Sequence, residues 1–414
     1  MRCCLPILAL TWTLSQACAA DWPQWRGPNR DGISKEKGLL DSWSKEGPKL
    51  LWTAKSLGSG YASVAIVDDH IYTLGDRGKG AELIALQRKT GKELWATKVG
   101  GGEPNSTPTV DGKYVYALGR DGDLLCVEAE TGNKVWSKSF SKDFGGKMMS
   151  GWGYSESILI DGDRLVCTPG AREADIVALD KTTGKTLWKS QVAIEGKRGR
   201  EGAGYSSIVA SKACGVKQYI QLTGRGVVSV SAEDGKPLWS YNRVANSTAN
   251  IPTPIVKDDY VFCSSGYGTG AALLKVVKKG NDLDVEEMYF LEANKLQNHH
   301  GGMILIGDHV YLGHGHNEGF PLCIDLMTGL EAWRPGRGPG TGSAAIVFAD
   351  GHLYFRYQNG VMALIEATPK EYRLKGSFKL ASVRGPSWPH PVVAGGKMYI
   401  RDRDVLLCYD ISKE

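Results

Sequence analysis

Five of the eight histidines stand where they could take part in binding or catalysis. His299 and His300 are adjacent in QNHHGG, His314 and His316 follow closely in GHGHNEG, and His390 lies in SWPHP. An imidazole can ligate a metal, exchange a proton near neutral pH or hydrogen-bond a loop. No acidic residue stands at ligand spacing from them, so two interpretations remain open: a metal- or cofactor-binding cluster, and a hydrogen-bonded layer of loops.

The other three histidines provide an internal control. His70, His309 and His352 occupy the same place in VDDHIY, IGDHVY and ADGHLY, and Lys113 and Lys397 fill that place elsewhere in the chain. A position that also accepts lysine is typical of a solvent-facing turn. The first five histidines are therefore the candidates for function.

A repeated hairpin is the element that must position these side chains. The phrase AELIALQRKTGKELWATKV at 81–99 returns in altered form at 123–140, 175–192, 227–241 and 321–333. Each copy has two short apolar runs around a turn that contains glycine, with an aromatic residue after the turn in a place where it can pack between sheets. Because repetition at about 40–50 residues indicates a closed or stacked array, we predict an all-β propeller.

The blades can be counted by the residue that closes each hairpin. For the first seven blades these residues are Trp95, Trp136, Trp188, Trp239, Tyr289, Trp333 and Phe378. The last unit, DVLLCYDISKE, lacks an outer strand, and KLLWTAK at 49–55 carries Trp52 in the repeat register. We therefore predict an eight-bladed β-propeller of four-stranded antiparallel blades, closed by an N-terminal strand that completes the C-terminal blade.

The N-terminal region divides into two parts before the propeller at 48–414. Residues 1–20 have the pattern of a secretory signal peptide, with Arg2, an apolar core and small residues before position 21, so we expect a periplasmic or secreted protein. The alternative is a lipid anchor at Cys18, although Ser15 stands where a lipobox has leucine. Residues 21–47, rich in Trp, Pro and Gly, are predicted to form an N-terminal strap on the propeller surface. No later run reaches the roughly 18–20 apolar residues of a membrane span.

Charge and cysteine content exclude some classes of function. The 50 basic and 45 acidic residues are spread along the chain, and the basic run at 197–200 is typical of a solvated loop, so we expect no nucleic-acid partner. Cys126, Cys323 and Cys408 take a small-residue position of the repeat that is alanine in other units. Because free cysteine packs as a small apolar residue, we expect no structural disulfide.

The predicted topology brings a second set of candidates to one mouth of the central channel. In each blade, the start of the first strand and the loop after the second strand lie at the same face, so the five histidines are expected there together. The other ligand-binding candidates at this rim are Tyr61, Trp152, Tyr154, Tyr205, Asn250, Arg356 and Trp388. Aromatic and polar residues in place of Val or Ile suit a concave site for a flat or polar ligand. The alternative is that these large side chains only plug the channel.

The repeat resembles that of a known family. ALDKTTGKTLW at 178–188 resembles the tryptophan-docking repeat of the quinoprotein alcohol dehydrogenases, and the chain is similar to the eight-bladed scaffold lipoprotein of outer-membrane β-barrel assembly. DWPQWRGP at 21–28 resembles the start of a group of exported quinone-repeat-like propellers. The resemblance implies a PQQ-like propeller over nearly all of the mature chain, and it does not assign a function because one fold hosts many sites.

The dehydrogenases of this family imply requirements that the sequence does not meet. They use pyrroloquinoline quinone, a Ca²⁺ ion held by carboxylate and amide oxygens, an aspartate base and usually a disulfide between adjacent cysteines. After the predicted signal peptide there is no adjacent cysteine pair, and Glu103, Glu156, Glu173 and Glu318 form no recognisable Ca²⁺ set. The sequence also contains no nucleophile elbow, HExxH or phosphate loop.

Two hypotheses follow. In the first, the protein is a non-catalytic binding platform or scaffold of the cell envelope, a monomeric ring whose channel mouth binds an envelope protein or a polysaccharide. In the second, it is a divergent quinone- or metal-dependent oxidoreductase that uses the histidine-rich mouth, with pyrroloquinoline quinone and calcium as its cofactors.

Overall fold

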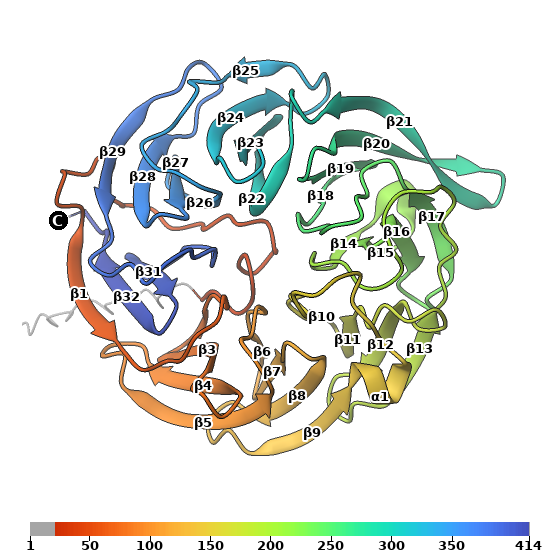
Figure 1. Cartoon of the computed structure of the whole chain (residues 1–414), viewed down its shortest axis with the longest axis horizontal. Helices are drawn as coiled ribbons and strands as arrows, with labels where there is room; N and C mark the ends of the chain where they lie inside the picture. Colours follow the sequence, from red (N-terminus) through yellow and green to blue (C-terminus); the bar gives the residue numbers. More distant parts are fainter. Residues whose placement is uncertain (1–20, 414) are drawn as a thin grey trace, which may run out of the picture.

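The repeated hairpins close into a ring in the computed structural model, which describes residues 21–413 (Figure 1). Strands β1–β32 form eight sheets, each with four antiparallel strands, so the predicted fold class is confirmed. The predicted signal peptide at 1–20 lies outside the described residues. Helical structure among the described residues is confined to α1 (Phe140–Phe144), after β9, and to a 3-10 turn at Ala213–Gly215.

Each of the first four blades is a meander whose strands follow one another from the channel to the rim (Figure 1). Blade 1 contains β2 (Ala65–Val67), β3 (His70–Asp76), β4 (Ala81–Gln87) and β5 (Glu93–Gly100). Blade 2 contains β6 (Thr109–Asp111), β7 (Tyr114–Leu118), β8 (Asp123–Glu128) and β9 (Lys134–Ser139). Blade 3 contains β10 (Leu159–Asp161), β11 (Arg164–Cys167), β12 (Ile176–Asp180) and β13 (Thr186–Ser190). Blade 4 contains β14 (Val209–Ser211), β15 (Gln218–Thr223), β16 (Gly226–Ser231) and β17 (Pro237–Tyr241).

The remaining blades repeat this order, with one exception in the last. Blade 5 contains β18 (Ile255–Lys257), β19 (Tyr260–Ser265), β20 (Gly270–Lys279) and β21 (Asp282–Glu292). Blade 6 contains β22 (Asn298–Ile306), β23 (His309–His314), β24 (Phe320–Asp325) and β25 (Glu331–Trp333). Blade 7 contains β26 (Ala344–Ala349), β27 (His352–Tyr357), β28 (Val361–Glu366) and β29 (Leu374–Lys379). Blade 8 contains β30 (Val392–Ala394), β31 (Lys397–Asp402), β32 (Val405–Asp410) and β1 (Lys49–Ala54).

The exception in blade 8 closes the ring. Strand β1 pairs antiparallel with β32, from Lys49 opposite Asp410 to Ala54 opposite Leu406. The N-terminal strand thus covers the edge that the C-terminal sheet would otherwise leave open. The predicted closure is confirmed.

The repeated aromatic residues pack each blade against the next, as Trp95 illustrates. The Trp95 ring lies over Gly132 in the following blade, where an added Cβ would come within 2.5 Å of the ring. Its indole N–H donates to the carbonyl oxygen of Ala129 at 3.1 Å. The backbone at Gly132 has φ 71°, a conformation that favours glycine. The repeated glycine therefore serves both the turn and the docking of the preceding tryptophan.

The strap packs on the propeller and also crosses its channel. Trp22 bridges Ile66 of β2, and the carbonyl of Pro23 accepts the amide of Val110 in β6. Ser34 then donates its amide to Phe348 of β26. In Figure 1 this red segment runs from the rim of the ring to its centre. One short segment thus contacts blades 1, 2 and 7.

Two buried arginines hold the crossing segment in place. Arg30, only 5% exposed, donates to the carbonyl oxygens of Ser157 at 2.7 Å, Ile158 at 3.1 Å and Ile208 at 3.0 Å. Arg26, 4% exposed, donates to the carbonyl oxygen of Met303 in blade 6. Hydrogen bonds from a charged donor are stronger than those between neutral groups. The strap is therefore part of the channel wall as well as a surface cover, which the sequence did not predict.

Candidate functional site

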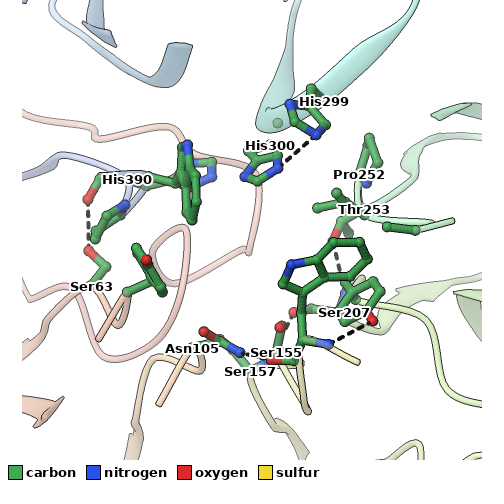
Figure 2. A pocket seen from close by; sticks show the side chains of 18 of the residues that line it. Ser63, Asn105, Ser155, Ser157, Ser207, Pro252, Thr253, His299, His300 and His390 are labelled. Atoms are coloured by element: carbon green, nitrogen blue, oxygen red, sulfur yellow. Dashed lines mark hydrogen bonds between the residues drawn. The ribbon is translucent and has the colours of Figure 1, made fainter. Parts of the chain in front are cut away.

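A cavity of about 590 Å³ lies at the mouth of the channel. Side chains from all eight blades line it, and Trp25 of the strap joins them. The labelled side chains surround it in Figure 2, with His299 and His300 on one side and Ser63, Asn105 and Ser157 on the other. A hollow of this size with mixed apolar and polar walls is typical of a small-molecule site.

Eight of the twelve predicted ligand-binding residues line this cavity. They are Tyr61, Trp152, Tyr205, His299, His300, His316, Trp388 and His390. Residues separated by up to 329 positions therefore meet in one wall, because the start of every inner strand points to the same mouth.

The other four predicted residues do not line the cavity. Each is buried behind its wall and bonded to partners there. The Tyr154 hydroxyl donates to the carbonyl of Pro169, and the side-chain amide of Asn250 donates to the carbonyls of Thr223 and Gly224. The imidazole of His314 accepts the amide of Gln297 at 3.2 Å. Arg356, only 1% exposed, forms an ion pair with Asp402. These side chains support the site from within the blades.

The histidine cluster on one side of the cavity is a hydrogen-bonded network. The Nε2 atoms of His299 and His300 lie 2.8 Å apart, so one ring donates its N–H to the other. His299 also contacts Ser343 Oγ at 2.8 Å through Nδ1 and the Tyr267 hydroxyl at 3.2 Å through Nε2. His316 packs against His299, with the ring centroids 4.2 Å apart.

The environment keeps these imidazoles uncharged. Burial first, and then the neighbouring imidazoles, lower the pKa of His299 to about 2 and that of His300 to about 3. Burial lowers the pKa of His390 to about 3, and the charge of Arg26 adds to the effect. Neutral imidazoles offer one donor and one acceptor each, so the cluster can recognise a polar ligand without attracting anions.

The side chains present do not fit a calcium–quinone centre or a metal site. Among residues 21–413, no group of three or more His, Cys, Asp or Glu side chains is arranged to hold a metal ion. Glu103 is the sole carboxylate among the described lining residues, and it already pairs with Arg403 at 2.9 Å. Glu156 lies buried and accepts from the amide and hydroxyl of Thr168. Ca²⁺ requires several oxygen ligands, usually with more than one carboxylate, so this mouth lacks its donor set.

His390 carries a buried atom whose hydrogen-bonding capacity is unused. The side chain is 9% exposed and lines the cavity, and the backbone of Ile346 and His300 lies beside its ring. Within the described chain its Nδ1 atom still has no hydrogen-bond partner of normal geometry. Its ring packs edge-on against Trp25, with the centroids 5.6 Å apart. A buried polar atom of this kind costs free energy until a ligand satisfies it.

A belt of hydroxyls forms a feature that the sequence reasoning missed. The amide of Ser63 donates to Thr107 Oγ1, that of Thr107 to Ser157 Oγ, that of Ser157 to Ser207 Oγ, and that of Ser207 to Thr253 Oγ1, at 3.0–3.1 Å. Each bond ties one blade to the next beside the cavity. The sequence signal is a Ser or Thr two residues before the inner strands of blades 1 to 5, at intervals of 44, 50, 50 and 46 residues.

Comparison with known proteins identifies relatives of much of the repeat array. A family model described as outer membrane protein assembly factor BamB matches residues 36–139 and 79–335. The BamB protein of Shewanella oneidensis is 24% identical over 240 residues, which cover 56% of this chain and 55% of that relative. The match thus spans about half of the relative's length.

Solved structures share the fold at low sequence identity. BamB from Moraxella catarrhalis superposes with a TM-score of 0.62 at 16% identity, covering 87% of this chain and 97% of that one. A europium-containing methanol dehydrogenase superposes with a TM-score of 0.68 at 11% identity, covering 92% of this chain and 88% of that one. These likenesses show a shared propeller, and no more than that.

Proposed function

The chain belongs to the family described as outer membrane protein assembly factor BamB, and on that premise we propose that it is a non-catalytic scaffold of the cell envelope. We further propose that an envelope protein or polysaccharide binds at the channel mouth. We place the protein in the periplasm or outside the cell. No helix within residues 21–413 is long and apolar enough to cross a membrane.

One observation carries the proposal. The two ends of the channel differ, because the strap crosses the channel and places Trp25 in the cavity wall, while the mouth presents one exposed aromatic side chain beside several partly buried aromatic and polar ones. The exposed aromatic side chain is Trp152, at 54%. Large exposed aromatic side chains beside a pocket are typical of a binding surface rather than of ordinary surface.

The side chains that line the cavity favour a binding platform rather than a redox enzyme. The cavity lacks the carboxylates that a calcium–quinone centre needs, and its imidazoles form bonds with one another and with Tyr267 and Ser343. A binding site needs only this arrangement of fixed donors, acceptors and rings.

Site-directed photo-crosslinking in the producing cells tests the proposal. A photoreactive amino acid in place of Trp152 probes the mouth, and the same residue in place of Lys113, exposed in the turn between β6 and β7, probes the opposite face. We expect the protein in the envelope fraction, with an adduct from position 152 and none of the same mass from position 113. Equal adducts from both faces, or recovery in the cytosol, would contradict the proposal.

A further inference from the structure

We propose that the cavity at the channel mouth binds the end of a neutral oligosaccharide, an inference that rests on the mouth being the binding face of the scaffold. The inference rests on three properties of the wall: a single unpaired charge, several aromatic rings, and many uncharged hydrogen-bonding groups.

The wall selects against charged ligands. Glu103 pairs with Arg403, which neutralises the one carboxylate among the described lining residues. Arg120 is the one lining arginine or lysine in the described chain; it donates to the carbonyl of Gly151 at 3.1 Å and keeps its positive charge. The imidazoles are neutral, as their lowered pKa values show. A phosphate, nucleotide or acidic peptide, each with several negative charges, would find this single arginine as its only charged partner, which is too little compensation for the loss of its hydration.

Aromatic rings line the same wall. They are Trp25, Tyr61, Trp152, Tyr205, Tyr267 and Trp388. Tyr61 and Trp388 stack with centroids 4.6 Å apart, and Trp152 meets Tyr205 edge-on at 5.9 Å. The C–H face of a pyranose ring is apolar while its edge carries hydroxyls, so a sugar can pack on such rings and still reach polar groups beside them.

The polar groups of the wall match a polyol. Thr107, Ser157 and Ser207 each accept a backbone amide, which leaves the hydroxyl hydrogen of each free to donate. His390 Nδ1 adds the buried nitrogen that has no partner among the described residues. Asn317 and Gln358 add amides. Sugar hydroxyls both donate and accept, so a wall that mixes these groups can satisfy them without charge.

The strap limits how far a ligand can enter the channel. Trp25 lines the cavity, while Arg26 and Arg30 on the same segment bond to carbonyls of blades 3, 4 and 6. A chain that enters from the mouth therefore stops at the strap and cannot thread the ring. We infer that the site takes a chain end rather than an internal segment.

The test measures binding of defined neutral oligosaccharides to the purified full-length protein. Isothermal titration calorimetry is run with maltotetraose, cellotetraose and chitotetraose, with tetragalacturonic acid as the charged comparison and tetraglycine as the peptide comparison. We expect at least one neutral tetramer to bind and both comparisons to fail.

Variants link that binding to the cavity. Trp152→Ala should weaken it about tenfold because it removes one stacking surface, and Trp152→Phe should retain most of it. Leu187→Ala, at a 50% exposed position on β13, serves as the matched surface control and should leave binding unchanged. Thermal melting of each variant checks that the ring is intact.

Three results would overturn the inference: no neutral tetramer binds, binding survives Trp152→Ala unaltered, or the acidic or peptide comparison binds more tightly. If the mouth still crosslinks to an envelope partner while no sugar binds, the scaffold proposal stands and only the oligosaccharide inference falls. If sugars bind without mouth-specific crosslinking, the cavity assignment stands and the scaffold proposal falls.

Discussion

Replacement of Arg356 by methionine should destabilise the ring strongly, because it removes one member of a buried ion pair. Arg356 is 1% exposed and Asp402 is 0% exposed, and their Nη2 and Oδ2 atoms lie 3.1 Å apart. Arg356 also donates to the carbonyl of Pro389 at 2.9 Å, next to the cavity residue His390. Burial lowers the pKa of Arg356 to about 10, so the guanidinium stays charged at neutral pH.

The expected cost follows from the charge that is left behind. In Arg356→Met, the Asp402 carboxylate keeps the amide of Arg384 at 3.1 Å as a donor but loses its counterion. Breaking a buried pair from one side typically costs about 3–5 kcal/mol. Asp402→Asn in the same background removes the stranded charge, so the double variant should recover part of the loss, with a coupling of about 1–3 kcal/mol.

Equilibrium urea unfolding followed by tryptophan fluorescence and circular dichroism measures these values, provided that the two signals coincide. The exposed pair Arg373–Glu366, with 45% and 30% exposed side chains 3.1 Å apart, is the matched control. Arg373→Met should cost less than about 1 kcal/mol. Equal costs at the two sites, or additive effects of Arg356→Met and Asp402→Asn, would refute the reasoning.

Two further predictions concern the cavity wall and the closure of the ring. The unfolded chain protonates His390 below its ordinary pKa of 6.5, while the folded protein keeps it neutral to about 3, so its contribution to stability falls as the pH drops. Urea unfolding should therefore show the unfolding free energy of the wild type falling by about 2 kcal/mol relative to that of His390→Gln between pH 7 and pH 5. An unchanged difference would contradict this. Trp52→Ala on β1 removes the ring that contacts Gly91 and should lower the free energy of unfolding by about 2–3 kcal/mol. Trp152→Ala, at an exposed position, should lower it by less than about 1 kcal/mol. A similar loss of stability in both variants would argue against the closing role of β1.

The architecture could be predicted because its signals are local and repeated. The register of each hairpin is contained in about fifteen residues, with a glycine turn and an aromatic residue that must dock on the next blade. Eight copies of that pattern, one split between the two ends, leave a closed ring as the arrangement that covers every sheet edge. The shared mouth of Tyr61, His300 and Trp388 follows from the same register.

The depth of individual side chains could not be predicted, because it depends on contacts between blades. Asn250 and Arg356 have the residue types of a binding rim, yet both bond to groups behind the wall. The hydroxyl belt was missed because serine and threonine are common before strands and become distinctive only when their bonds to the next blade are seen.

The sequence by itself determined the fold, the number of blades, the strand exchange that closes them and the face at which the aromatic and histidine residues meet. Only the tertiary structure decided that the strap crosses the channel, that the cavity wall carries almost no free charge and that His390 holds a buried nitrogen without a partner among the described residues. The physical reason is the range of the interactions. Periodic patterns encode hydrogen bonds within a blade, whereas the path of a non-repeated segment depends on carbonyls of blades that lie far apart in the chain.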